Sequence, residues 1–256
     1  MKLPLERQEN RRSNQGVCVS QKCRASKLIL FDMDGTLVDI GHVHREAVFG
    51  AVRDVFRAEL EQDIPPDVHQ GNTQHNILRA VGRVLGLDPE WVEAHLDEAI
   101  QRQIELSISI LERDLQHVVL PGVMALLIKL QDAGHALGLV TGTVSGVTDA
   151  VLDRTGLRRF FGVRVCGDEG PDRLSLLQLA VDRAVQAYGW VPGDGEVVVI
   201  GDTIRDVEAA KQLGARVVAV ASGMTAPEEL RHHRPDALLT SFEDVLAAAR
   251  AIEGAG

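Results

Sequence analysis

The sequence predicts an α/β protein whose core is a Rossmann-like, doubly wound parallel sheet, interrupted by an inserted helical domain. Six short apolar runs have strand character, and helical patterns lie between most of them. The runs are apolar at successive positions rather than at alternate ones, which is typical of parallel strands covered on both faces. About a hundred residues separate the first run from the second without a convincing strand, which indicates an insertion. The runs are residues 28–31, 136–140, 163–165, 197–200, 217–220 and 237–239.

The insertion is predicted to be an α-helical cap domain at residues 41–117, with the α/β core formed by residues 27–40 and 118–256. Two apolar stripes at helical spacing predict its first two helices, and Asp88 with Pro89 predicts the N-cap and first turn of a third. The stripes are Ala47, Val48, Ala51, Val52, Val55 and Phe56, then Ile77, Leu78, Val81, Val84 and Leu85, then Trp91, Val92, Leu96, Ile100 and Ile104.

Length and charge limit the class of partner. A chain of 256 residues with 45% apolar content can bury one substantial core and a smaller second unit. The formal charge of -10 disfavours nucleic acid and anionic membranes as partners and favours a small molecule. Either a monomer or a homodimer is compatible with the sequence.

The polar start of the chain and the few cysteines indicate a cytoplasmic protein. Residues 1–26 are predominantly polar and are therefore predicted to be a disordered tail outside the fold. The start of the chain also lacks the apolar segment of a secretory signal. No stretch reaches the roughly 18 apolar residues that a membrane helix needs. Cys18, Cys23 and Cys166 neither pair completely nor match the spacing of a zinc site, so a reducing compartment is the simplest setting.

Three of the predicted strands end in residues suited to phosphate and metal chemistry. The first leads into residues 32–36 (DMDGT), the second into Thr141 and Gly142, and the fourth into residues 201–203 (GDT). Each motif alone is commonly a helix cap or a turn. Ligands of open α/β sheets bind at the carboxyl ends of the strands, so the three motifs are expected to converge on one crevice.

The acidic residues of these motifs predict a metal site. Asp32, Asp34, Asp202 and Asp206 would bring like charges into a small volume, and a cation would make that arrangement tolerable. Ligands that offer only oxygen point to Mg²⁺.

Phosphoryl transfer gives these groups separate roles. A carboxylate at a strand end, Asp32, can attack phosphorus and form an aspartyl phosphate. A second carboxyl two residues later, Asp34, can protonate the leaving alcohol and then accept a proton from water. The hydroxyl of Thr141 and the backbone N–H groups that follow, beginning with Gly142 at a helix start, can hold the phosphoryl oxygens.

The same residues resemble a known family. The run FDMDGTLVD at 31–39 resembles the first motif of the haloacid dehalogenase superfamily, and residues 140–142 (VTG) and 201–206 (GDTIRD) resemble its second and fourth. The resemblance covers about residues 27–242. It implies that Asp32 is the nucleophile and a metal ligand, and that the main-chain carbonyl of Asp34 also binds Mg²⁺.

By the same resemblance, Asp202 is a further ligand and Asp206 supports the metal site from just outside it. The insertion is similar to the cap of phosphoglycolate phosphatases and β-phosphoglucomutases. Its segment Gly71, Asn72 and Thr73 resembles the loop that reaches toward substrate in those proteins.

One motif departs from the family pattern. The third motif normally supplies a lysine, yet no lysine occurs between Lys129 and Lys211. Arg173 stands near the expected position and could bind two phosphate oxygens at once, although it could equally be an ordinary ion-pairing arginine on a helix.

Further substrate contacts are predicted in the cap. His44 lies where mutase-like relatives carry a histidine beside the cap hinge, although a solvated surface histidine is an alternative. Gln74 and His75 could face the substrate beside Gly71 and Thr73, or could be exposed loop residues.

The predicted function is Mg²⁺-dependent hydrolysis of a small phosphate monoester through an aspartyl phosphate. A dehalogenase is disfavoured because Asp34 supplies an acid/base group that halide displacement does not use. A sugar phosphomutase is a second possibility, disfavoured because Gln74 stands where mutase-like relatives offer an arginine. A catalytically weak binding or regulatory protein would suit the missing lysine. Glycolate phosphate, sugar phosphates and nucleotides all remain open as substrates.

Overall fold

The predicted parallel sheet is confirmed. A computed structural model describes residues 27–60, 64–69, 71–189 and 197–254, so the expected tail at 1–26 lies outside the described residues. Six parallel strands form one sheet in the order β3-β2-β1-β4-β5-β6. The strands are β1 (Leu28–Phe31), β2 (Ala136–Val140), β3 (Val163–Val165), β4 (Val197–Gly201), β5 (Arg216–Val220) and β6 (Ala237–Leu239).

The strand order brings three of the sequence motifs to one edge. Strand β1 lies between β2 and β4, and Phe31 at its end is in register with Leu139 of β2 and with Ile200 of β4. The chain leaves β1 toward one side of the sheet and crosses to the other side for β4. The residues that follow these three strands therefore meet at the point where the strand order reverses, which is where open α/β sheets bind ligands.

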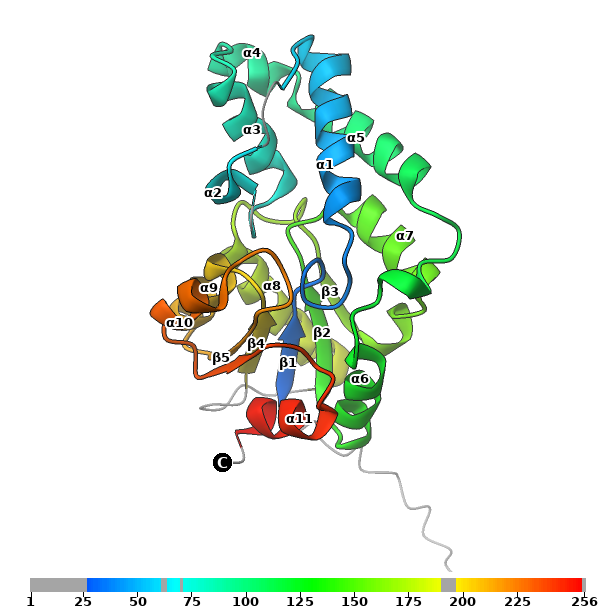
Figure 1. Cartoon of the computed structure of the whole chain (residues 1–256), viewed down its shortest axis with the longest axis vertical. Coiled ribbons are helices and arrows are strands. Elements are labelled where there is room, and N and C mark those ends of the chain that lie inside the picture. The colour runs from blue at the N-terminus through cyan, green and yellow to red at the C-terminus, as the bar shows by residue number, and fades with distance from the viewer. Residues whose placement is uncertain (1–26, 61–63, 70, 190–196, 255–256) are drawn as a thin grey trace, which may run out of the picture.

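Helices cover both faces of the sheet (Figure 1). The side chains of Leu28 and Leu30 pack with α8, α9 and α10, whereas those of Ile29 and Phe31 pack with α6, α7 and α11. Continuous apolar runs thus feed two separate hydrophobic layers. The helices of the core are α6 (Val123–Asp132), α7 (Ser145–Thr155), α8 (Arg173–Tyr188), α9 (Ile204–Leu213), α10 (Pro227–His232) and α11 (Val245–Glu253), with a 3₁₀ turn η3 (Arg158–Phe160).

Within its described residues, the segment between β1 and α6 is helical and contains no named strand, and it lies beyond the carboxyl ends of the strands (Figure 1). The six apolar residues predicted to share the first helical face are all buried. The elements are α1 (Gly41–Ala51), the π-helix η1 (Val52–Phe56), α2 (Pro66–His69), α3 (Gln74–Val84), α4 (Pro89–Ala94), α5 (Leu96–Ile110) and the 3₁₀ turn η2 (Gln116–Val118).

Two details of the helical predictions were wrong. Asp88 does cap a helix, since its side chain accepts the N–H of Trp91, but the single predicted third helix is divided into α4 and α5 at His95. The His95 backbone leaves helical geometry (φ -109°, ψ 5°), because its ring Nδ1 lies 2.8 Å from the Trp91 carbonyl oxygen and its ring stacks on Trp91. Val84 was assigned to a buried face but is 61% exposed, because it lies at the last residue of α3.

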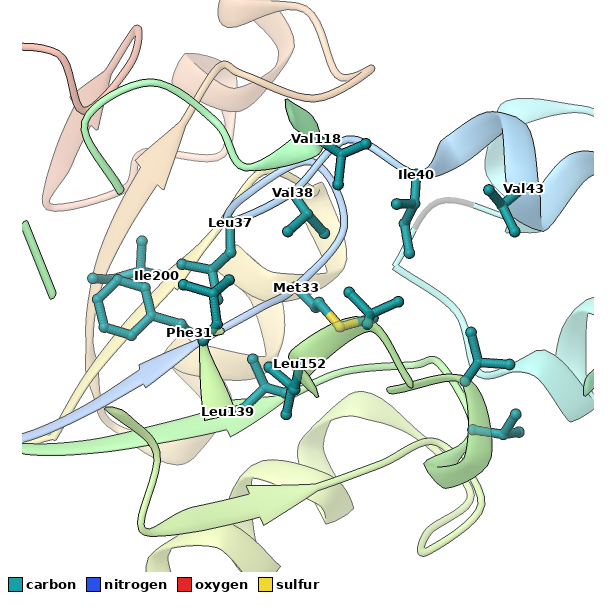
Figure 2. Packing of buried hydrophobic residues seen from close by; sticks show 14 of the residues in the cluster. Phe31, Met33, Leu37, Val38, Ile40, Val43, Val118, Leu139, Leu152 and Ile200 are labelled. Carbon is teal, nitrogen blue, oxygen red and sulfur yellow. The ribbon is translucent and has the colours of Figure 1, made fainter. Parts of the chain in front are cut away.

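The hydrophobic core runs without a break from the sheet into the helical segment. Figure 2 shows Met33 and Leu37 beside Phe31, followed by Ile40 and Val43 at the start of α1. These side chains are at most 1% exposed, so the junction between the two units is packed as tightly as the sheet itself. Among the described residues, no helix has the length and apolar character needed to cross a bilayer.

A glycine at the start of α6 provides a test of this packing. Gly122 has φ +83°, and a Cβ there would lie 1.9 Å from the carbonyl oxygen of Phe242. We expect Gly122→Ala to reduce the free energy of unfolding by about 3 kcal/mol or more, because backbone rather than a flexible side chain must move. Chemical denaturation followed by circular dichroism measures the change.

The control is Gly134→Ala, which has nearly the same φ (+81°) but no atom within 4 Å of the added Cβ. This variant should lower the free energy of unfolding by only roughly 1–2 kcal/mol, which is the cost of placing an L-residue in the left-handed conformation. Equal losses for both variants would contradict the packing argument.

Candidate active site

The two aspartates that follow β1 point to different places. The Asp32 N–H donates to the Ile200 carbonyl (2.9 Å), which extends the pairing with β4 and leaves the carboxylate at the sheet edge, 6% exposed. The chain then turns, since the Leu37 N–H donates to the Met33 carbonyl (2.8 Å). Asp34 is therefore directed toward α1, where its Oδ1 accepts the N–H of Ile40 (2.8 Å).

The end of β4 supplies two more carboxylates. Thr203 caps α9 in a reciprocal arrangement, in which Asp206 Oδ2 accepts both the N–H (3.1 Å) and the hydroxyl (2.6 Å) of Thr203. Asp202 Oδ1 accepts the Thr36 hydroxyl (3.1 Å), which ties the first and fourth motifs together.

Two glycines make room for Asp202. A Cβ on Gly35 or on Gly223 would lie 2.4 Å or 1.8 Å from Asp202 Oδ2. The loops after β1 and β5 therefore enclose this carboxylate through backbone alone.

Arg173 is buried among these carboxylates rather than exposed on a helix. It is the first residue of α8, after the N-cap Asp172, and is 7% exposed. Its Nη2 donates to Asp32 Oδ1 (2.8 Å) and its Nη1 donates to the Val140 carbonyl (2.9 Å). Its Nε lies 3.0 Å from Asp206 Oδ1, which is an ion pair without hydrogen-bond alignment. Arg173 thus contacts residues at or just after the ends of β1, β2 and β4.

The donor set fits a hard divalent cation. One oxygen from each of Asp32, Asp202 and Asp206 lies within 4.8 Å of the others, and carboxylates are the ligands that Mg²⁺ prefers. Both oxygens of Asp206 already contact Thr203 or Arg173, which agrees with a supporting position just outside the ligands. The Asp34 side chain is turned toward α1, so Asp34 would have to contribute through its main-chain carbonyl.

Burial governs the proton affinities of this site. Burial raises the pKa of Asp32 to about 7, with the Asp206 carboxylate adding to the rise and Arg173 opposing it. Burial, followed by the Asp32 and Asp206 carboxylates, raises the pKa of Asp202 well above its usual value. Burial also raises the pKa of Asp34, although His44 opposes the rise. Without a cation, these groups are therefore held toward their protonated forms.

Arg173 remains charged in this environment. Burial alone would lower the pKa of its guanidinium, but the Asp206 and Asp32 carboxylates outweigh burial and raise it. A permanent positive charge is thus retained beside Asp32.

Thr141 and Gly142 lie at the end of β2, but the helix expected directly after them begins later. Helix α7 starts at Ser145, so the intervening residues form a turn in which Thr141 Oγ1 accepts the Thr143 N–H (3.1 Å). The backbone N–H groups after Thr141 therefore belong to this turn and not to a helix start. The turn forms because the Gly167 N–H donates to the Thr143 carbonyl (2.9 Å).

The loop before α3 packs directly on the strand ends. The Gln74 N–H donates to the Gly142 carbonyl (3.2 Å), and a Cβ on Gly71 would lie 2.5 Å from Thr203 Oγ1. Thr73 is the N-cap of α3, where its hydroxyl accepts the Asn76 N–H, so it holds the helix start. The predicted cap residues are thereby brought to the edge of the sheet that carries the aspartates.

His44 and Gln74 are both turned inward. The Nε2 of His44 lies 3.8 Å from Asp34 Oδ2 and 3.4 Å from the Thr143 hydroxyl, and Gln74 Nε2 lies 3.5 Å from its Nδ1. Burial lowers the pKa of His44, and Asp34 opposes this. The alternatives of a solvated histidine and an exposed glutamine are wrong, since the His44 side chain is 15% exposed and Gln74 is 4% exposed. His75 is half-buried.

Sequence reasoning missed Gln103, Thr36 and Thr143. Gln103 on α5 is 2% exposed and donates through Nε2 to Gln74 Oε1 (2.6 Å). Its sequence signal was a polar residue four positions after Ala99, on the face of α5 that also carries Leu96 and Ile100.

A cavity of about 680 Å³ lies between the aspartates and the helical segment. Core residues from the loops after β1, β4 and β5 form its floor, and α1 with the loop before α3 forms its opposite wall. Its lining includes Asp34, Asp202, His44, Gln74, Val48, Ile77 and Met224.

A parallel sheet with carboxylates gathered at its carboxyl edge, beneath an inserted helical segment, defines an α/β protein with a ligand site at the ends of its strands. The model of the haloacid dehalogenase-like hydrolase family matches residues 26–214. The chain belongs to this family, which confirms the resemblance of its motifs.

Two relatives at 30% identity or more are named as phosphatases. The chain is similar to the phosphoglycolate phosphatase of Synechococcus elongatus, with 31% identity over 220 residues that span 86% of this chain and 95% of that protein. It is 30% identical over 222 residues to the N-acetylmuramic acid 6-phosphate phosphatase of Pseudomonas aeruginosa, over 81% of this chain and 87% of that one. Among solved structures, a hydrolase from Pseudomonas syringae shares the fold, with a TM-score of 0.67 and 23% identity over 86% of this chain and 96% of that one.

The raised proton affinity of Asp32 predicts a pH dependence of stability. Between the ordinary pKa of 3.8 and about 7, the unfolded chain has released this proton while the folded protein keeps it. The stability contributed by protonated Asp32 is therefore present below about pH 4 and is lost as pH rises to about 7. In EDTA at pH 7.5, we expect Asp32→Asn to be more stable than the wild type by roughly 1–3 kcal/mol, measured by thermal unfolding.

The gain should shrink toward pH 4, and the exposed Asp182→Asn on α8 should show neither effect. A variant that is less stable than the wild type at pH 7.5 in EDTA would refute this account of Asp32.

Proposed function

We propose that this protein is a Mg²⁺-dependent phosphatase that hydrolyses a small phosphate monoester through an aspartyl-phosphate intermediate. The observation that carries the proposal is the position of Asp32, which lies at the end of β1 with the guanidinium of Arg173 2.8 Å from one carboxylate oxygen and Asp202 beside it. Asp34 is close by in sequence but directed toward the cavity wall. One carboxylate is thus arranged to attack and another to exchange protons.

The first half-reaction joins Asp32 to phosphorus. An oxygen of Asp32 forms a bond to the phosphorus as the ester oxygen leaves, and the protonated carboxyl of Asp34 donates its proton to that oxygen. In this proposal Arg173 and Thr141 hold the phosphoryl oxygens during transfer. Mg²⁺, when bound, offsets the negative charge of the carboxylates and of the phosphoryl group.

The second half-reaction releases phosphate. The Asp34 carboxylate takes a proton from a water molecule, whose oxygen forms a bond to phosphorus while the bond to Asp32 breaks. Asp32 and protonated Asp34 are then restored. Burial raises the pKa of Asp34, which favours its protonated form and supports its role as the proton donor.

We propose that residues 41–117 act as a cap over this chemistry. The backbone contact from Gln74 to Gly142 and the apolar junction at Ile40 and Val43 support a helical unit that closes on the strand ends. Closure would exclude bulk water and present Gly71, Thr73 and Gln74 to the substrate. A small phosphorylated metabolite is the partner that fits such an enclosed space.

An assay of an aryl phosphate tests the function. We expect hydrolysis of para-nitrophenyl phosphate with Mg²⁺, and a loss of at least about 10³-fold with EDTA or in Asp32→Asn, because the attacking oxygen or its charge compensation is removed. The rate is measured from the absorbance of the released para-nitrophenol.

Asp182→Asn controls for the loss of a carboxylate elsewhere. A metal-independent rate, or an unchanged rate in Asp32→Asn, would remove the proposal. Absence of turnover across a broad panel of phosphorylated metabolites would favour the binding or regulatory protein, and transfer of the phosphoryl group to a second sugar hydroxyl would favour the phosphomutase.

Substitution of Arg173 tests its role beside Asp32. We expect Arg173→Met to lower kcat/KM by about 10²–10³-fold, because a fixed positive charge at the phosphoryl position is lost. Arg173→Lys should retain part of the activity, since it keeps the charge but cannot contact both Asp32 and the Val140 carbonyl in the same way.

The control is Arg183→Met on the same helix, which removes a peripheral ion pair with Glu169. Circular dichroism checks that each variant is folded. If Arg173→Met and Arg183→Met are equally active, Arg173 has no part in phosphoryl transfer.

A further inference from the structure

The cavity extends well beyond the reacting groups. Its volume of about 680 Å³ corresponds to about 20 water molecules at about 30 Å³ each, and lies within the roughly 300–1,000 Å³ typical of pockets for drug-sized ligands. Part of its wall is apolar, formed by Val48, Ile64, Ile77 and Met224. A two-carbon phosphate ester would leave most of this space to water and would not reach that wall.

Among the polar residues that line the cavity, Gln74 carries a neutral amide that is held in one orientation. Gln74 is 4% exposed and lines the cavity, and its Oε1 accepts the Nε2 of buried Gln103 (2.6 Å). This contact occupies the carbonyl side of the Gln74 amide and leaves its NH₂ group directed toward His44 and the cavity wall. An amide so placed can bond a hydroxyl or carbonyl group, but it offers no charge to balance an anion.

The charges around the cavity also oppose a second anion. Besides Asp34 and Asp202, the carboxylates of Asp39 and Glu46 line it, together with three imidazoles, of which that of His44 has its pKa lowered by burial; the other two are His42 and His69. Arg45 lines it too, but its guanidinium carbon lies over the Phe49 ring, 5.1 Å from the centroid. A carboxylate or second phosphate on the substrate would therefore enter a space rich in negative charge.

We propose that Gln74, oriented by Gln103, is a specificity-determining residue that selects phosphate monoesters of uncharged, sugar-sized alcohols over those that carry a second anionic group. The inference rests on the proposed phosphatase function and narrows its substrate class. Size is set by the cavity and its apolar wall, and charge selection by the neutral amide and the surrounding carboxylates. A buried polar group that must hydrogen-bond its ligand discriminates strongly against a ligand that leaves that group unpaired.

Four probes separate size from charge. Glycerol 3-phosphate is small and otherwise neutral, 2-phosphoglycolate is small and carries a carboxylate, glucose 6-phosphate is sugar-sized and otherwise neutral, and 6-phosphogluconate is of that size with a carboxylate. With Mg²⁺, we expect kcat/KM for glucose 6-phosphate to exceed that for each of the other three by at least about 10-fold, from phosphate release.

Exchange of the amide for a cation tests the residue. Gln74→Arg should lower the ratio of kcat/KM for glucose 6-phosphate to that for 6-phosphogluconate by at least about 10-fold, because the new guanidinium pairs with the carboxylate. Gln74→Leu keeps the approximate size of the side chain but removes its hydrogen-bonding amide. It should lower kcat/KM for glucose 6-phosphate alone, and so reduce the ratio of kcat/KM for glucose 6-phosphate to that for 6-phosphogluconate. Gln101→Arg adds the same charge at an exposed position of α5 and should leave the ratio unchanged.

Binding to Asp32→Asn distinguishes failure of the inference from failure of the proposed function. Stabilisation of this variant by each probe, measured as a shift in melting temperature with Mg²⁺, reports selection without turnover. If none of the four is hydrolysed but glucose 6-phosphate alone stabilises the variant, the phosphatase proposal fails and the selectivity stands. Preference of the wild type for 2-phosphoglycolate or 6-phosphogluconate, in turnover or in binding, would overturn the inference and leave the phosphatase intact.

Discussion

The buried guanidinium of Arg173 is the interaction on which the arrangement of the site depends. It contacts Asp32 after β1, the carbonyl of Val140 at the end of β2, and Asp206 after β4. A buried cation is stable only when an opposite charge lies nearby and its N–H groups have acceptors. A buried carboxylate likewise needs a nearby positive charge and hydrogen-bond donors. Arg173 is thus the cation that both carboxylates share, and its removal would leave Asp32 and Asp206 without a positive partner at the strand ends.

The identity of that cation shapes the site. A lysine would supply a compact charge, whereas the planar guanidinium reaches Asp32 and the Val140 carbonyl with two nitrogens and approaches Asp206 with a third. This geometry fixes the orientation of the Asp32 carboxylate at the end of β1. The single positive charge of Arg173 does not balance all the carboxylates. The pKa of Asp202 therefore stays well above its usual value, because of burial and of the neighbouring carboxylates. The deficit is what a divalent cation would offset.

The sheet and the aspartates could be predicted because each depends on short stretches of sequence. A buried parallel strand requires a continuous apolar run, and the residue after such a run reaches the carboxyl edge whatever the rest of the chain does. The positions of Asp32, Thr141 and Asp202 at the carboxyl ends of their strands could therefore be predicted from the local sequence pattern alone. The break at His95 could not be predicted in this way, because it arises from a side chain that contacts the carbonyl four residues earlier.

Contacts between segments far apart in the sequence could not be predicted from the local sequence pattern. The position of Arg173 depends on where α8 begins relative to β1 and β4, and nothing in its neighbours distinguishes a buried from an exposed arginine. Gln103 is similar, since its partner Gln74 lies 29 positions away on another helix. Both are polar residues on faces that packing encloses, and burial forces each to find a specific partner.

The two halves of the cavity are built on different physical terms, which explains how constant chemistry and variable selectivity can share one site. Behind the core side, Arg173 forms ion pairs with both Asp32 and Asp206, so a change at any one of the three alters the surroundings of the other two. On the helical side, the loop is held to the strand ends by a backbone bond from Gln74 to Gly142, which does not depend on the Gln74 side chain. That side chain can therefore be exchanged without undoing the contact between the two units, whereas the core charges cannot.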